Sequence, residues 1–221
     1  MEYTREGEVM VACHALKAEI DHLQEKTGIY RPIVWVDRGL HNFPDKLKAT
    51  LQEALDSVED AHTVLLAYGN CGNALQGIVT GDFETIIPNV DDCISILFGS
   101  KRARMDYSAE HAAFFLTEGW MDADHSIVQE YNYTVEKYGQ EQADSITEMI
   151  YAHYRTMAYL ETGLYDIDAL MDTTRHLCDV CGMKQVVEPV SIEYVEQLVA
   201  GPWDDKRFLH VPPRSKVPFF G

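Results

Sequence analysis

Short apolar segments alternate with amphipathic helical segments along the first hundred residues, and this alternation limits the possible folds more than any other feature. Behind Pro44, for example, Leu47, Leu51 and Leu55 recur at helical spacing. Strands that are apolar throughout are buried on both faces, and connecting helices cover those faces. We therefore predict an α/β fold with an open, mostly parallel, Rossmann-like sheet and helices on both faces. The predicted strands are 8–12, 32–36, 63–67 and 84–87.

Three further helices are expected between and after these strands. Leu16, Ile20 and Leu23 share one face of a helix that follows the first strand. A short helix is expected over 74–78, and another over 92–98, capped by Asn89 or Asp91 and closed by Gly99.

The second half of the chain is richer in helical patterns but returns to the same alternation. Gly139 is expected to break the segment 126–154 into helices, and Gly182 to end the helix 166–181. We expect the tail 214–221 to be loosely held. The remaining predicted elements are strands 114–117, 157–160, 185–188 and 208–211 and a helix over 191–200.

A chain of 221 residues is compatible with one hydrophobic core, so we predict a single α/β domain over 1–221. The alternative is a pair of interlocked lobes, 1–120 and 156–221, joined by the helical segment 121–155. This segment would be an insertion or a lid.

The charge balance argues against nucleic acid as a partner. The chain has 36 acidic and 18 basic residues, a net charge of −18, which repels phosphate backbones. No basic and apolar leader opens the chain, and no apolar run reaches the roughly 18 residues of a membrane helix. We expect a cytoplasmic protein that does not contact membranes, in which the five cysteines are free thiols or ligands rather than disulfides.

Cys13, Cys71 and Cys93 each follow a predicted strand. The carboxyl ends of parallel strands meet at one edge of a sheet, where ligands bind. Three converging thiolates would repel one another unless a cation lay between them. We therefore predict that these cysteines bind a metal, either Zn²⁺ with an open fourth position or an iron–sulfur cluster with one open iron.

Other interpretations of these cysteines stay open. A free cysteine often behaves as a small apolar core residue, and Cys93 fits this best because Ile94, Ile96 and Leu97 surround it. A pair of thiols facing each other across a substrate, as in a metal-free racemase, leaves the third unexplained. Cys71 fits a core role least, because it lies in a glycine-flanked turn. In that turn Gly69, Asn70, Gly72 and Asn73 are the predicted cofactor contacts.

Glu118, His14 and Tyr68 are the candidate groups for proton transfer at the same edge. The alternatives are a surface carboxylate for Glu118 and a hydrogen-bonded bystander for His14. Cys178 and Cys181 form a C-x-x-C pair that ends a helix, which predicts a structural role. Phosphate-binding loops, dinucleotide turns and nucleophile elbows are absent from the sequence.

The segments around these cysteines resemble the domain-of-unknown-function family numbered 1638. The likeness rests on Ala12-Cys13-His14, Tyr68-Gly-Asn-Cys-Gly-Asn73, Asp91-Asp92-Cys93, Thr117-Glu118-Gly119-Trp120 and Gly201-Pro202-Trp203. The family pattern has cysteines at the positions of Cys13, Cys71 and Cys93. It departs from this chain in having an acidic residue at position 14 and a proline at position 118.

The resemblance implies a link to corrinoid-dependent methyltransferases and one-carbon metabolism, because members of the family are encoded beside them. Two hypotheses follow for the function. One is a metal- or iron–sulfur-dependent enzyme, of transferase or lyase type, that acts on a small molecule. The other is a non-catalytic accessory or metal-carrying protein that binds a corrinoid protein or a methyltransferase.

Overall fold

A computed structural model describes residues 3–121 and 126–220 of the chain. They divide into two compact units: unit 1 comprises the described residues up to Arg102 and from Ser191 onward, and unit 2 comprises Ala103–Val190. These boundaries differ from the lobes 1–120 and 156–221 suggested by the sequence, because the last helix and strand return to unit 1. The segment 121–155 falls within unit 2.

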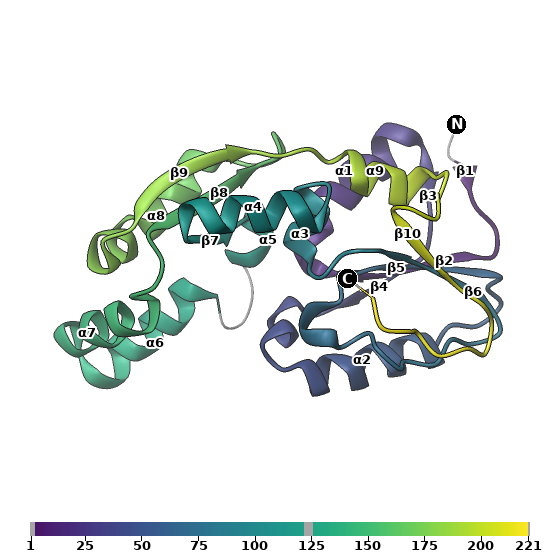
Figure 1. The fold of residues 1–221 in the computed structure, drawn as a ribbon, viewed down its shortest axis with the longest axis horizontal. Coiled ribbons are helices and arrows are strands. Elements are labelled where there is room, and N and C mark those ends of the chain that lie inside the picture. Colours follow the sequence, from purple (N-terminus) through teal and green to yellow (C-terminus); the bar gives the residue numbers. More distant parts are fainter. Residues whose placement is uncertain (1–2, 122–125, 221) are drawn as a thin grey trace. The chain divides into compact units, whose positions relative to one another are not determined.

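Unit 1 is built on a five-stranded sheet with the order β10-β6-β5-β2-β4 (Figure 1). Four strands are parallel, and β10 runs antiparallel to β6 at the edge. Central β5 is buried over its whole length. The strands are β2 (Glu8–Cys13), β4 (Ile33–Val36), β5 (Thr63–Ala67), β6 (Glu84–Pro88) and β10 (Phe208–Val211), and a separate parallel pair is β1 (Tyr3–Thr4) with β3 (Ile29–Tyr30).

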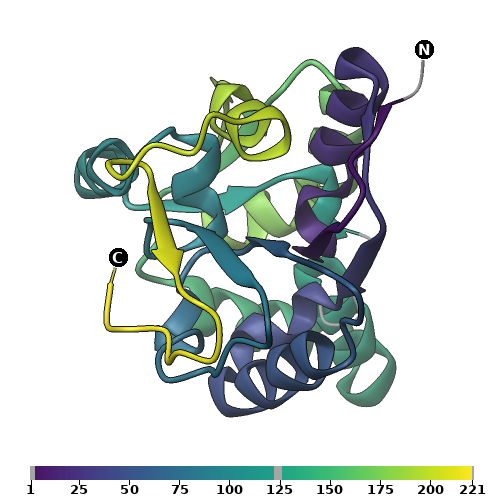
Figure 2. The ribbon, with the colours of Figure 1, turned by 90° about the vertical axis from the view of Figure 1, so that its right-hand side faces the viewer.

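Helices cover both faces of this sheet, with α2 on one face and α1 and α9 on the other (Figures 1 and 2). Pro44 begins α2, where its missing N–H costs nothing, and the predicted leucines of this helix are at most 1% exposed. The predicted α/β fold with a mostly parallel, helix-covered sheet is confirmed. The helices of unit 1 are α1 (Lys17–Thr27), α2 (Pro44–Asp56), α3 (Cys93–Leu97) and α9 (Glu193–Ala200).

The order of the strands creates a switch point between β2 and β5. The chain leaves β2 through α1 toward β4 on one side, and it leaves β5 toward β6 on the other side. Loops that diverge from neighbouring parallel strands open a crevice at their carboxyl ends, which is where ligands bind in such sheets. The carboxyl ends of β2 and β5 are therefore the place to look for a site.

Unit 2 is a smaller α/β unit. Its sheet has three parallel strands in the order β7-β8-β9. Phe114 packs edge-on against Tyr151 and Tyr154, whereas neighbouring Phe115 packs against Tyr107, so consecutive side chains of β7 serve opposite faces. Its strands are β7 (Ala113–Leu116), β8 (Thr156–Glu161) and β9 (Lys184–Pro189), and its helices are α5 (Glu118–Met121), α6 (Ile127–Tyr138), α7 (Gln140–Tyr151) and α8 (Ile167–Cys181), while α4 (Lys101–His111) crosses the unit boundary.

Gly139 and Gly182 end helices of unit 2 as expected. Gly139 has a φ of 83° and separates α6 from α7, and Gly182 has a φ of 63° and ends α8 in the left-handed conformation. No helix in the described ranges is long and apolar enough to cross a membrane.

Some local expectations were wrong. Residues 74–77 form a turn rather than a helix, after the 3-10 helix Cys71–Asn73. Neither Asn89 nor Asp91 caps α3: Asp92 does, because its carboxylate accepts a hydrogen bond of 2.7 Å from the Ser95 amide. Helix α4 was not predicted, since it buries no residue and lacks an apolar stripe.

The tail 214–221 was expected to be loose, but through residue 220 it is held against unit 1. Val217 is 2% exposed, accepts from the Gly77 amide at 2.8 Å and donates to the Ile78 carbonyl at 2.8 Å. The Asn70 side-chain amide donates to the Phe220 carbonyl at 2.8 Å. These contacts join the end of the chain to the loop that carries Cys71.

His210 on β10 should contribute more to the stability of unit 1 at acidic than at alkaline pH. Burial opposes its charging, but Glu84 at 3.0 Å, the Trp203 carbonyl at 3.0 Å and Asp205 at 3.7 Å outweigh burial and raise the pKa of His210. A raised folded-state pKa adds stability below the unfolded value and loses it as the pH rises through the folded value. We expect His210→Gln to cost stability at pH 5.5 and much less at pH 8.5 in urea unfolding. An equal cost at both pH values would contradict this assignment.

Candidate functional site

The three cysteines lie at the carboxyl edge of the unit 1 sheet. Cys13 is the last residue of β2 and is paired in register with Val36 at the end of β4. Cys71 begins the 3-10 helix after β5, and Cys93 is the first residue of α3 after β6. Each thiol therefore lies at the carboxyl end of one of three parallel strands, in the region of the switch point.

The sulfur atoms form a contiguous group with Cys93 in the middle. Cys71 Sγ lies 3.9 Å from Cys93 Sγ, and the Cys93 thiol also interacts with the Cys13 sulfur. Cys13 and Cys93 are 5% and 6% exposed, whereas Cys71 is half-buried. Cys71 is therefore the thiol of the three that is most accessible to a ligand.

The neighbours of the thiols favour a thiolate at Cys13. Hydrogen bonding from Cys93 lowers the pKa of Cys13 against the opposing effect of burial, with help from the Ala15 amide, the Tyr68 hydroxyl and Arg38. The same interaction, a further one with Cys71, and burial raise the pKa of Cys93. Without an ion, this arrangement favours the thiolate form more at Cys13 than at Cys93.

Tyr68 is 1% exposed, and its hydroxyl lies 3.3 Å from the Val36 carbonyl and within hydrogen-bonding reach of Cys13. Burial, followed by the nearby sulfurs, raises the pKa of Tyr68. The tyrosine therefore remains a protonated donor beside the Cys13 sulfur.

The turn 68–73 requires its glycines for packing. A Cβ on Gly69 would lie 2.2 to 2.5 Å from backbone atoms of Asp92, so this glycine lets the Cys71 loop and the Cys93 loop touch. Gly72 has a φ of 57°, and a Cβ there would lie 2.6 Å from Pro44. The Gly69 contact brings the loops carrying Cys71 and Cys93 together.

The two asparagines of this turn differ in what they can offer a cofactor. Asn70 is 3% exposed and uses both side-chain N–H groups, at 3.3 Å to Asn73 and 2.8 Å to the Phe220 carbonyl. Its side-chain oxygen accepts from the Leu75 amide at 3.3 Å. These bonds hold the loop, whereas Asn73 is exposed.

His14 contacts a residue that sequence reasoning did not single out. Its Nδ1 lies 3.1 Å from Nη1 of Arg38, and its ring packs edge-on against Trp35 at 5.6 Å. Arg38 follows the carboxyl end of β4, the neighbour of β2, and is 6% exposed. The same carboxyl-end argument that located the cysteines could have indicated it.

The other candidates belong to unit 2. Glu118 is exposed at the first residue of α5 in unit 2, so it is not among the residues around the thiols within unit 1. Cys178 packs in the unit 2 core beside the Tyr159 hydroxyl at 3.6 Å, and half-buried Cys181 contacts the Thr147 carbonyl at 3.8 Å. These contacts fit the structural role expected for both.

The thiol group suits a soft metal ion in its chemistry and, for two of the three sulfurs, in its spacing. Two thiolates on one tetrahedral zinc, with bonds of about 2.3 Å, stand about 3.8 Å apart. The Cys71–Cys93 separation of 3.9 Å is close to this value. Within the described ranges, however, no three Cys, His, Asp or Glu side chains are already arranged to hold a metal. Shared binding by all three thiols would require a side chain to move.

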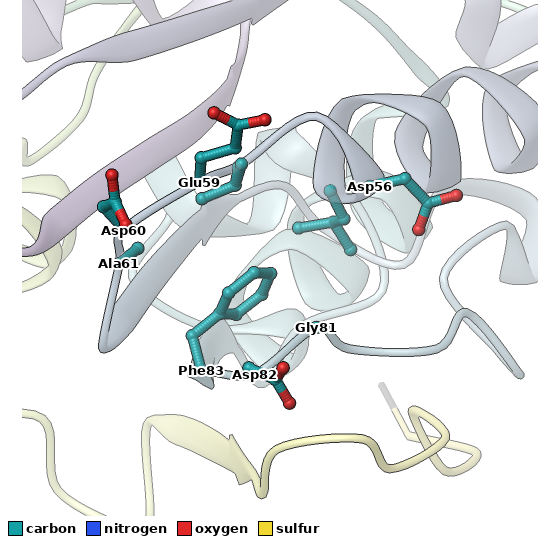
Figure 3. A pocket seen from close by; sticks show the side chains of 9 residues that line it. Asp56, Glu59, Asp60, Ala61, Gly81, Asp82 and Phe83 are labelled. Carbon is teal, nitrogen blue, oxygen red and sulfur yellow. The ribbon is translucent and has the colours of Figure 1, made fainter.

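A cavity of about 610 Å³ lies at the opposite edge of the sheet (Figure 3). It is lined by the segments that precede β5 and β6, including Asp56, Glu59, Asp60 and Asp82. Asp82 is paired with Arg214 at 2.8 Å. The lining residues of the cavity include no cysteine, histidine, lysine or arginine beside these carboxylates, so the cavity does not compete with the thiol group as a candidate.

The comparisons with known proteins yielded one family and no individual relative. A family model with the description "Protein of unknown function (DUF1638)" matches residues 35–199. The searches of curated proteins and of solved structures found no significant match.

Proposed function

The chain belongs to the DUF1638 family, whose description assigns no activity, and we propose that it is a metal-dependent enzyme that acts on a small molecule at Cys13, Cys71 and Cys93. The observation that carries the proposal is the contiguous thiol group at the carboxyl edge of the sheet, with two sulfurs 3.9 Å apart. Three thiolates leave a fourth position open, as in catalytic rather than structural zinc sites.

A single zinc ion fits the spacing better than an iron–sulfur cluster. In a four-iron cluster with one open iron, each thiolate binds a different iron, so the sulfurs stand further apart than two sulfurs on one ion. Cys71 and Cys93 have the spacing of a shared ion. The same distance counts against a metal-free pair of thiols, because a substrate carbon in van der Waals contact with both sulfurs would need about 7 Å between them.

The roles of the surrounding residues follow from their contacts. A bound zinc ion would supply a Lewis acid that activates a bound water or thiol. Tyr68 would donate a hydrogen bond at the Cys13 sulfur and His14 would handle a proton. Glu118, which belongs to unit 2, stays a proposed proton-transfer group.

The family resemblance supplies the proposed context, a transferase or lyase step in corrinoid-dependent one-carbon metabolism in the cytoplasm. The five free cysteines are consistent with a reducing compartment. In the alternative, the chain is an accessory protein that carries metal to a corrinoid protein or a methyltransferase. Such a carrier would bind the ion but would show no turnover.

The proposal predicts zinc binding that depends on all three cysteines. Protein purified without oxygen should bind one Zn²⁺ per chain in competition with a chelating dye. Ser in place of Cys13, Cys71 or Cys93 should weaken binding by about 100-fold or more, because removing a ligand costs more than removing its supporting partner. Metal analysis and an absorption spectrum check this result, since a cluster would be brown and zinc protein colourless.

Cys181→Ser is the matched control, because Cys181 is also half-buried but lies in unit 2. It should bind zinc like the unmodified protein. Unchanged zinc affinity in Cys71→Ser and Cys93→Ser would refute the proposed metal site. A brown protein after reconstitution with iron and sulfide would show that the site holds a cluster instead of zinc.

A further inference from the structure

We propose that Arg38, oriented by His14, forms an anion-binding subsite beside the thiol group, so that the substrate is a small molecule with a carboxylate or phosphate group. This inference rests on the proposed function, because it names the substrate class of the same site. It depends on a buried guanidinium that has no carboxylate partner within the described ranges and that keeps donors beyond its contact with His14.

The sheet places Arg38 at the same edge as Cys13. The strands β2 and β4 are paired with Cys13 opposite Val36, and the chain turns after Val36 into the 3-10 helix Arg38–Asn42. Arg38 and His14 thus follow the carboxyl ends of neighbouring strands. Ligands of parallel sheets bind at such ends, and this pair lies beside the switch-point strand β2.

The positive charge of Arg38 is buried without an ion pair in the part of the chain that the structure describes. Arg38 is 6% exposed. It has no ion pair among the residues that the structure describes, even though the chain has 36 acidic residues and only 18 basic ones. Its neighbour Asp37 uses its carboxylate to accept from the Gly39 amide at 2.6 Å. Burying a charge is costly, and Arg38 meets the Cys13 sulfur through its charge alone, so a bound anion would stabilise this arrangement further.

Arg38 does not donate a hydrogen bond to the Cys13 sulfur. The groups that hydrogen-bond the Cys13 sulfur are Cys93, the Ala15 amide and Tyr68, whereas Arg38 acts on it through its charge alone. Of the guanidinium nitrogens, Nη1 contacts His14. The guanidinium therefore keeps donors for a second partner, and its planar fork suits the paired oxygens of a carboxylate or a phosphate.

His14 orients the guanidinium of Arg38. Arginine can only donate, so the Nδ1 atom that faces Arg38 at 3.1 Å accepts and the ring carries its proton on Nε2. The edge-on contact with Trp35 at 5.6 Å fixes the plane of the ring. The two ring nitrogens point in different directions, so the Nε2–H group faces away from Arg38, and the contribution of His14 is to hold the guanidinium in place.

The test uses inorganic phosphate and acetate as probes, titrated into the full chain by calorimetry at constant ionic strength. We expect the unmodified protein to bind at least one of them with a millimolar Kd, and Arg38→Gln to weaken that binding about 10- to 100-fold. Arg38→Lys keeps the charge but loses the fork, so it should lie between the two. Preference for phosphate or for acetate identifies the anionic group.

Arg214→Gln is the control, because it removes a positive charge from an exposed pair with Asp82 and should leave anion binding unchanged. Equal affinity in Arg38→Lys, Arg38→Gln and the unmodified protein, or no binding of either probe at about 50 mM, would overturn the inference. If Arg38→Gln does not fold, the comparison with Arg38→Lys decides.

Titrations with and without one equivalent of Zn²⁺ separate this inference from the metal proposal. Anion binding that needs Arg38 in a protein unable to bind zinc would support the subsite and refute the metal site. Zinc binding that needs the cysteines, together with anion binding that does not depend on Arg38, would support the metal site and refute the subsite.

Discussion

Alanine in place of Gly69 should lower the free energy of unfolding by about 3 kcal/mol or more and weaken zinc binding at least about 10-fold. The new Cβ would lie 2.2 Å from the Asp92 carbonyl carbon and 2.5 Å from its Cα and oxygen. Backbone cannot rotate away as a flexible side chain can, so the loops that carry Cys71 and Cys93 must separate. Urea unfolding and the chelator competition measure the two effects.

Gly99→Ala provides the comparison, because it adds the same methyl group within unit 1 but meets no atom within 4 Å. Its φ of 76° should cost about 1 kcal/mol, with zinc affinity unchanged. If Gly69→Ala were no more harmful than Gly99→Ala, the close contact between the two loops would not hold the thiols together.

The elements with a strong local pattern were the ones that the sequence predicted. Pro44 followed by leucines at helical spacing predicts α2, and Gly139 and Gly182 predict where helices of unit 2 end. Helix α4 has no such pattern, because none of its residues is buried. The held tail depends on Val217 meeting the segment around Ile78, a long-range pairing without a local signal.

The convergence of the cysteines could be expected because parallel strands end at a common edge, but the details of the site could not. The 3.9 Å spacing of Cys71 and Cys93 depends on the Gly69 contact with Asp92, which joins two loops. The burial of Arg38 depends on the register of β2 with β4. The division into a five-stranded and a three-stranded sheet likewise follows from pairing partners that lie far apart in the sequence.

Removal of the Glu8 carboxylate should be among the most harmful single changes in unit 1. Glu8 accepts from Arg31 Nε at 2.7 Å, and the Arg31 side chain is fully buried while that of Glu8 is 11% exposed. Nη1 and Nη2 of Arg31 have no hydrogen-bond partner within the described ranges. Burial lowers the pKa of Arg31, and Glu8 opposes that effect.

Glu8→Ala should therefore cost about 3 to 5 kcal/mol in urea unfolding, because it leaves an uncompensated buried charge. Asp82→Ala breaks the exposed pair with Arg214, whose side chains are 71% and 78% exposed, and should cost much less than Glu8→Ala. The double variant Glu8→Leu with Arg31→Met should be more stable than Glu8→Ala, since it removes both charges together. If it were less stable than Glu8→Ala, the penalty would come from lost packing rather than from the unpaired guanidinium.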